Sequence, residues 1–231
     1  MGRHSLPGHP PVALTLRKSS RARRISLRIS QLDGRVTLTY PQGVPESEAI
    51  GFARTKEDWI RAHLRARPEP AVVQFGQALP IEGAPRRIVP AKGRRVALEP
   101  DRIAVPEGAE GRRLARFLKE LARDRLTGAC DDYAAMLGRT YSSLTLRDTR
   151  SRWGSCSSAG GLMFSWRLIL APPEVLHYVA AHEVAHLAEM NHSPAFWAQV
   201  ERLFGPYDAP RQWLRVNGAE LHRYRFDPGP G

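Results

Sequence analysis

One short run in the second half of the chain carries the residue types that metal-dependent hydrolysis requires. It reads His182-Glu183-Val184-Ala185-His186, and a further histidine, His192, follows six residues later. In a helix, His182 and His186 project from one face, where two imidazoles can bind one metal ion. Glu183 lies about 100° round the helix from His182, beside the metal rather than on it. That position suits a general base acting on a metal-activated water.

The third protein ligand is either His192 or Glu189. Glu189 lies within about 20° of His182 on a helical wheel, two turns along. His192 can reach the metal only if the helix stops, and Asn191 tolerates the left-handed conformation that ends helices. Ser193-Pro194 is typical of the cap and first position of a new helix. The break favours His192, and three such ligands with one open position favour catalytic zinc.

The elements around this run must bury and position it. The face opposite the histidine pair carries Leu176, Ala180, Val184 and Leu187, so we expect a largely buried helix that begins at 171–174. Apolar spacing and turn signals predict the other elements of this half. They are a helix over 111–137, a strand over 144–146, a hairpin of 150–157 with 162–170, and helices over 194–204 and 208–217.

The first half is predicted to be β-rich, with one helix from Pro45 or Ser47 to before Pro68. We expect Trp59 to pack that helix on a hairpin that turns at Asp33-Gly34, and residues 1–11 to lack structure. The fold class is therefore α+β, with subdomains over 12–105 and 106–227. The expected strands span 12–16, 25–30, 36–40, 72–75, 87–89, 96–98 and 103–105.

The composition is that of a soluble globular protein. The 231 residues are 42% hydrophobic and 25% charged, which allows a substantial core. The two cysteines, Cys130 and Cys156, form no disulfide framework or C-x-x-C motif. No signal peptide and no membrane span are expected, so the cytoplasm is the expected compartment.

The net charge is +12, from 31 Arg and 4 Lys against 23 acidic residues. Such a balance favours polyanionic partners, so nucleic acid could bind an Arg-rich surface. A GC-rich coding sequence would produce the same skew toward Arg.

Several motifs together resemble the YgjP-like metallopeptidase domain family, over about residues 12–225. The resemblance implies zinc on His182, His186 and His192, with Glu183 catalytic. It also implies a zincin-like second half, similar to SprT-like peptidases, in which a small sheet packs on the helix that carries H-E-x-x-H. The motifs are Arg152-Trp153-Gly154-Ser155-Cys156-Ser157, Trp166-Arg167-Leu168, Ala171-Pro172, the histidine run, Asn191-His192-Ser193 and Phe196-Trp197.

The chain departs from that pattern at Ser165 and His177, where many members carry Asn and Asp. Metzincins share the spacing of the three histidines, but they carry Gly where this chain has Glu189, and no Met-turn is present. The departures at Ser165 and His177 bear on substrate contacts and not on the metal ligands.

Peptide hydrolysis needs substrate contacts and an oxyanion donor. Trp166 and Tyr178 are candidate substrate contacts, and 162–168 is the strand to which an extended peptide could add. Donor candidates are Tyr178, His177, Tyr207, Arg211 and His222.

Two other functions share these features. The three histidines resemble the metal site of the rRNA-maturation endoribonuclease family, although that family usually lacks a Glu after its first His. A non-catalytic zinc module that binds nucleic acid would also use the basic surface.

Overall fold

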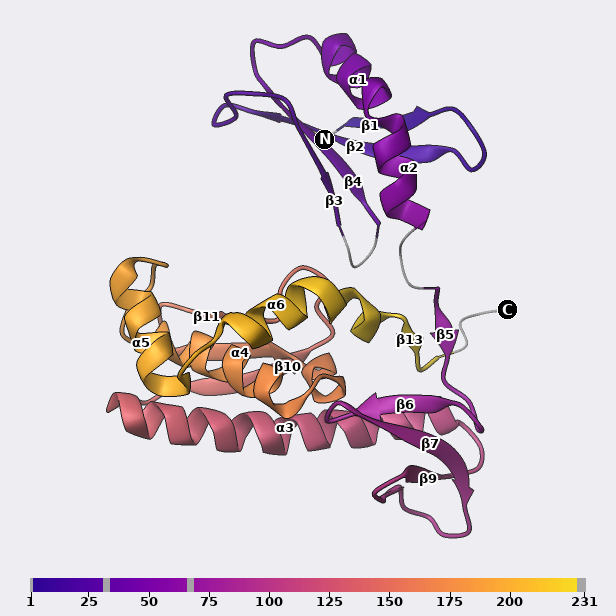
Figure 1. Cartoon of the computed structure of the whole chain (residues 1–231), viewed down its shortest axis with the longest axis vertical. Coiled ribbons are helices and arrows are strands. Elements are labelled where there is room, and N and C mark those ends of the chain that lie inside the picture. The colour runs from indigo at the N-terminus through magenta and orange to yellow at the C-terminus, as the bar shows by residue number, and fades with distance from the viewer. Residues whose placement is uncertain (1, 31–33, 66–68, 228–231) are drawn as a thin grey trace. The chain divides into compact units, whose positions relative to one another are not determined.

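The computed structural model describes residues 2–30, 34–65 and 69–227, and the chain divides into two compact units, Met1–Glu69 and Pro70–Gly231. Figure 1 traces both units in chain order. The secondary structure is mixed α+β, as predicted. Every helix of the described residues is too short or too polar to cross a bilayer.

The first unit is a four-stranded sheet with two helices. The sheet order is β1-β2-β4-β3, with β2 and β4 parallel and the other pairs antiparallel. Alternate residues of β4, among them Val36 and Leu38, are buried, because successive side chains of a strand face opposite sides. The elements are β1 (Gly2–Leu6), β2 (Val12–Ser19), β3 (Ser26–Ile29), β4 (Val36–Pro41), α1 (Glu46–Thr55) and α2 (Glu57–Arg65).

Three expectations for this unit need correction. Residues 2–6 form β1, paired with β2, instead of lacking structure. The single helix is two, separated at Lys56. Trp59 is 42% exposed, and its ring lies 4.2 Å from that of His63, at a tilt, instead of packing on the hairpin. The β3–β4 hairpin is antiparallel as expected, and Asp33 of its turn lies outside the described residues.

The second unit begins with two small sheets. β5 (Ala71–Val72) pairs in parallel with β13 (Tyr224–Arg225) near the other end of the unit. The second sheet has the order β6-β7-β9-β8. Its strands are β6 (Ala78–Ile81), β7 (Ala84–Ala91), β8 (Ala97–Leu98) and β9 (Arg102–Pro106).

The boundary between units lies after Glu69, not at 105/106 as the sequence suggested. Leu79, Ile88 and Ile103 of the β6–β9 sheet are buried in the same core as Leu114 and Leu118 of α3 (Glu110–Leu137). An apolar face that packs against α3 cannot belong to a separate core, so these strands are part of the unit that holds the histidines.

The histidine run is surrounded by the remaining elements of this unit. A third sheet, of order β10-β12-β11, and the long helix α3 both pack near α4 (Figure 1). The bounds are β10 (Ser143–Arg147), β11 (Gly154–Cys156), β12 (Gly161–Ser165), the 3-10 helix η1 (Trp166–Leu170), α4 (Pro173–Ala185), α5 (Pro194–Phe204), α6 (Asp208–Asn217) and the 3-10 helix η2 (Gly218–His222).

The chain after β12 differs from the expected strand over 162–170. It leaves the sheet after Ser165 and forms η1. Trp166, a candidate substrate contact, is 2% exposed and packs against Phe226 and the guanidinium of Arg167. Trp166 is therefore a core residue, because a peptide could not reach its indole.

The start of α4 is fixed by the β6–β7 turn. Glu82 and Gly83 both have positive φ, and the amide of Glu82 donates to the carbonyl of Ile169, 2.7 Å away. A Cβ on Gly83 would lie 2.9 Å from Cα of Pro172, so only glycine allows the turn to approach the residue before α4 this closely.

Candidate metal centre and its surroundings

The structure brings the three predicted histidines together. Helix α4 ends at Ala185, and the chain turns back to α5, whose cap is Ser193 and whose first residue is Pro194. The hydroxyl oxygen of Ser193 accepts a hydrogen bond from the amide of Phe196, and Oδ1 of Asn191 accepts one from the amide of Ser193. The chain thus turns back before His192 as predicted, but α4 ends at Ala185, well before Asn191, and Asn191 does not have the expected positive φ.

One ligand atom from each of His182, His186 and His192 lies within 4.8 Å of the others. The Nε2 atoms of His182 and His192 are 3.1 Å apart. Two nitrogens bound tetrahedrally to one zinc at 2.0–2.1 Å would be about 3.3 Å apart. The spacing of these two imidazoles thus fits a shared metal ion.

The protonation states also fit. Nδ1 of His186 lies 2.9 Å from the carbonyl oxygen of Glu189, so Nδ1 carries the proton and Nε2 keeps its lone pair. Burial, with the nearby His186, His192 and Arg211, lowers the pKa of His182 to about 3. Burial likewise lowers the pKa of His186. Neutral imidazoles are the form that binds metal.

Glu189, the alternative third ligand, contributes its carbonyl oxygen to His186 and does not belong to the group of three ligand atoms. The geometry therefore favours His192. Cys156 is also outside that group, and burial raises the pKa of its thiol, with Glu183 adding to the effect. A thiol with a raised pKa is a poor metal ligand at neutral pH.

Glu183 is 6% exposed and lies against β11. Burial raises the pKa of its carboxyl to about 8, and the charge of Arg152 partly opposes this. Within the described part of the chain its carboxylate makes no hydrogen bond and no ion pair. A buried carboxyl that lacks partners beside a cluster of imidazoles is typical of a functional site.

Aromatic side chains of α5 hold the imidazoles in place. Phe196 is fully buried, and its ring centroid lies 4.9, 4.4 and 4.7 Å from those of His182, His186 and His192. Trp197 lies 5.6 Å from His182 and 5.8 Å from His192. The sequence showed both as one motif of the resemblance, with no role at the metal, and their place directly after the Ser193 cap was the available signal.

The oxyanion candidates separate into two groups. Tyr178 is 6% exposed, with its ring 6.0 Å from that of His182 and stacked on Tyr207. Arg211 stacks on Trp197 and is close enough for its charge to affect His182. These three stay candidates.

The other two candidates lie elsewhere. His177 contacts the hydroxyl of Tyr133, 3.2 Å away, and lines a small cavity that also includes Glu82 and Arg125. His222 packs on Trp153. Neither side chain contacts an imidazole of the histidine cluster in the described structure, so neither is placed to meet an oxyanion there.

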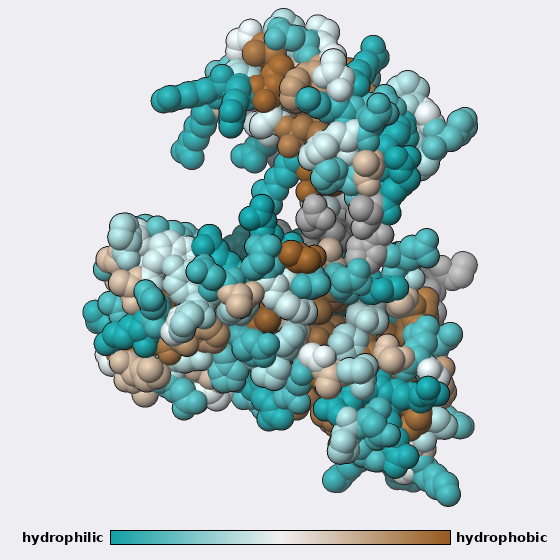
Figure 2. Space-filling view, in the orientation of Figure 1, coloured by the Kyte–Doolittle hydropathy of each residue, from teal (hydrophilic) through white to brown (hydrophobic). Residues whose placement is uncertain are grey.

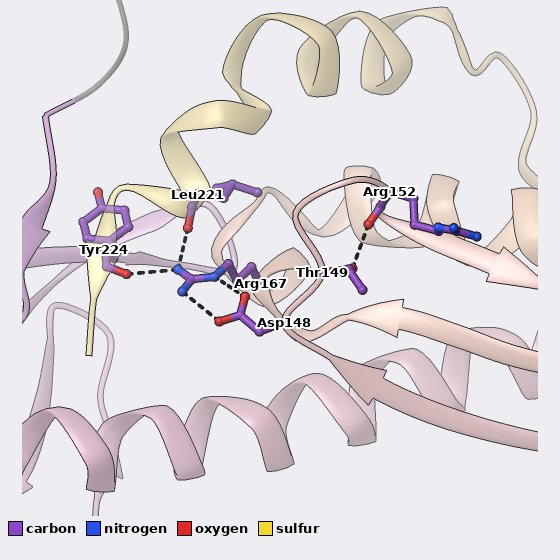
Figure 3. A network of polar contacts seen from close by, with 6 residues as sticks. All are labelled: Asp148, Thr149, Arg152, Arg167, Leu221 and Tyr224. Atoms are coloured by element: carbon purple, nitrogen blue, oxygen red, sulfur yellow. Dashed lines mark hydrogen bonds and ion pairs between the residues drawn. The ribbon is translucent and has the colours of Figure 1, made fainter. Parts of the chain in front are cut away.

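The segment before β11 is tied to the end of the unit by Arg167 (Figure 3). Its guanidinium is almost fully buried and donates to both carboxylate oxygens of Asp148, at 2.6 and 3.1 Å, and to the carbonyls of Leu221 and Tyr224, both at 3.0 Å. A buried guanidinium needs such partners. Arg167 thereby links η1, the segment after β10, and η2.

The site's geometry agrees with what the sequence comparisons find. A family model described as YgjP-like, metallopeptidase domain, matches residues 23–217. The chain belongs to this family. This family is one of metallopeptidases. The histidine cluster of the YgjP-like chain lies within the matched region, so it supplies candidate ligands for the metal.

Comparison with individual proteins adds little to the family assignment. No curated protein matches the YgjP-like chain. Among solved structures it is similar to that of the metallopeptidase zymogen of Pyrococcus abyssi abylysin, at 22% identity and a TM-score of 0.36, over 40% of this chain and 92% of that one.

Proposed function

We propose that this chain is a zinc-dependent peptidase in which His182, His186 and His192 hold the metal and Glu183 is the general base. The observation that carries the proposal is the convergence of three imidazoles beside a buried carboxyl. When bound, zinc supplies Lewis-acid chemistry, lowering the pKa of water toward about 7 and polarising a carbonyl.

Glu183 accepts the proton that the attacking water releases and passes it to the leaving amine. A base works best when its pKa lies near the working pH. Burial, partly opposed by the charge of Arg152, raises the pKa of the Glu183 carboxyl to about 8, and a divalent cation on the neighbouring imidazoles would favour the carboxylate and lower that pKa toward neutrality. Burial and metal charge therefore act together to tune this one group.

The substrate strand would add at β11, not at 162–168 as the sequence suggested. β12 is the central strand of its sheet, paired with β10 on one side and β11 on the other. The amide of Ser157 donates to the carbonyl of Gly161 and the carbonyl of Trp153 accepts from the amide of Ser165, both on β12, so by alternation the N–H and C=O groups of Gly154 and Cys156 point to the outer edge. That edge adjoins Glu183, which favours a peptide bound in extended form there.

The test uses fluorescein-labelled casein as the probe, with zinc-loaded wild type and Glu183→Gln. We expect cleavage by wild type, and a rate 10²–10⁴-fold lower in the variant at equal zinc content, the range for loss of a general base. Equal rates would remove Glu183 from its role. A zinc-loaded wild type that leaves casein intact under conditions where a known metallopeptidase cleaves it would overturn the peptidase proposal.

A second candidate function is contact with nucleic acid, which a basic groove in the second unit favours. Arg94 and Arg95, before β8, and Arg113 and Arg116, in the first turns of α3, line an open groove with Val96, Pro106, Phe117 and Glu120. In the described part of the chain none of these four guanidiniums forms an ion pair. Hydrophilic residues cover much of the visible surface around β7 and β9 (Figure 2).

This candidate is tested by titrating a labelled single-stranded RNA at several salt concentrations. Phosphate contacts predict a linear fall of log affinity with log salt, and Arg113→Glu with Arg116→Glu should reduce that slope. Arg139→Glu, at the other end of α3, is the matched control. RNA that is bound but stays intact with zinc present would exclude the endoribonuclease alternative, and no binding at physiological salt would exclude this function.

A further inference from the structure

The backbone of β11 makes an unusually close contact with the side chain of Glu183. A Cβ atom on Gly154 would lie 2.6 Å from both Cγ and Oε1 of Glu183, and 2.8 Å from its Cδ. Contacts under 3.0 Å essentially do not occur for real Cβ atoms. Gly154 does not have a positive φ. Glycine is needed at this position for the space it leaves, not for its backbone conformation.

Packing, rather than hydrogen bonding, sets the direction of the Glu183 carboxylate. No hydrogen bond to that carboxylate exists among the described residues, and Glu183 is only 6% exposed. Its neighbours on α4, Val184 and Ala181, are fully buried, so the helix cannot move to accommodate a larger residue at 154. The side chain of Glu183 must rotate instead.

β11 is equally unable to move away. The carbonyl of Trp153 accepts a hydrogen bond from the amide of Ser165 at 2.8 Å. The indole of Trp153 lies 5.1 Å from the ring of His222, and a Cβ on Gly218 would come within 3.0 Å of its Cζ2. Arg167 holds η2 and the segment that leads to Trp153 (Figure 3). Trp153 thus fixes the strand residue that follows it.

We infer that Gly154 is a positioning residue for Glu183: its missing side chain lets β11, anchored through Trp153 on η2, hold the carboxylate in one orientation beside the three imidazoles. The inference rests on the proposed function, because that function gives Glu183 its task. It also assigns a role to the Trp153–Gly154 pair, which the metal site does not otherwise use.

The size of the effect follows from the contact. Ordinary contacts begin at 3.4 Å, so a methyl group at 154 displaces the carboxylate by roughly 1 Å, and a misplacement of that size can lower a rate by about 10²-fold. Gly154→Ala should therefore lower kcat for casein by about 10²-fold. Zinc content and KM should stay close to wild type, because the three heavy atoms nearest to a Cβ at position 154 all belong to Glu183.

The matched control is Gly128→Ala on α3, where a Cβ would have nothing within 4 Å. We expect wild-type kcat from it. Glu183→Ala removes Cγ, Cδ and Oε1 and so relieves the contact, so in the double variant with Gly154→Ala the loss should be smaller than the product of the two single losses. A purely structural role for Gly154 predicts multiplicative losses, reduced zinc content and a changed KM.

Crystal structures of zinc-loaded wild type and Gly154→Ala give a result that does not depend on activity. We expect superposed imidazoles and a displaced Glu183 carboxylate. An unmoved carboxylate, or a Gly154→Ala variant with wild-type kcat, overturns the inference. If wild type cleaves no peptide, the proposed function fails. The two structures still show whether a side chain at position 154 displaces the Glu183 carboxylate. If Gly154→Ala does not fold, the double variant is expected to fold, and its failure to do so also overturns the inference.

Discussion

Replacing Glu183 with Gln should remove a pH-dependent loss of stability from the metal-free protein. Burial raises the pKa of the Glu183 carboxyl from 4.5 to about 8 in the folded chain. Between these two values the folded state holds a proton that the unfolded state has released. The free energy of unfolding therefore falls as pH rises through this window, and stops falling above about pH 8.

The rise in the pKa of Glu183 from 4.5 to about 8 corresponds to a change of about 5 kcal/mol in the free energy of unfolding, at 1.36 kcal/mol per pKa unit. Gln does not titrate, whereas the neighbouring histidines titrate in both proteins. The difference between wild type and variant therefore isolates the contribution of Glu183. We expect similar stabilities near pH 4.5, and a variant more stable than wild type by about 3–5 kcal/mol at pH 8.5.

The assay is urea unfolding in the presence of a chelator, monitored through tryptophan fluorescence. Four of the five tryptophans, all except Trp59, belong to the second unit, so the signal reports mainly on the unit that holds Glu183. Glu201→Gln replaces an exposed carboxylate on α5 and should give no pH-dependent difference. Parallel stability curves for wild type and Glu183→Gln from pH 4.5 to 8.5 would refute the reasoning, because a buried, unpartnered carboxyl could not then be present.

Three further changes test other parts of the unit. His192→Ala should reduce zinc from about one per chain, measured by elemental analysis; unchanged zinc would place the third ligand elsewhere. Phe196→Ala removes a fully buried ring that contacts all three imidazoles, and should cost about 3–5 kcal/mol in thermal unfolding and weaken zinc binding; unaltered zinc affinity would mean that the ring does not position the ligands. Asp148→Ala leaves the guanidinium of Arg167 without its carboxylate and should cost about 1–3 kcal/mol, because Asp148 is partly exposed. Burial raises the pKa of Asp148, but its hydrogen bond and ion pair with Arg167 outweigh that and lower it. The pair's contribution is thus complete above about pH 4 and lost as pH falls through the lowered pKa, which denaturation at pH 7 and pH 2 would show; an equal effect at both would contradict it.

The parts of the site that depend on neighbouring residues could be predicted from sequence. The bounds of α5 and the break before it follow from Ser193 and Pro194, whose cap bond spans only three residues. The helical spacing of His182 and His186 is equally local. Such features need no knowledge of the rest of the fold.

The parts that depend on distant pairing could not be predicted. Residues 162–168 have the same apolar pattern whether they form an edge or a central strand, and only the pairing of Leu146 with Phe164 across the sheet makes β12 central. Trp166 could belong to a binding surface or to the core until Phe226, sixty positions later, covers it. β1 was missed because its partner lies in β2 and its own residues carry little pattern.

This division between local and distant determinants has a consequence for activity. The three candidate metal ligands, His182, His186 and His192, come from one continuous stretch of the chain. The orientation of Glu183 is different, because it depends on β11, on Trp153 and on η2, which meet only in the folded unit. Substitutions at Gly154 or Gly218 should therefore separate metal binding from catalysis, whereas substitutions in the histidine run remove both. A motif search for H-E-x-x-H alone would not detect the substitutions at Gly154 or Gly218, although we expect them to misplace Glu183.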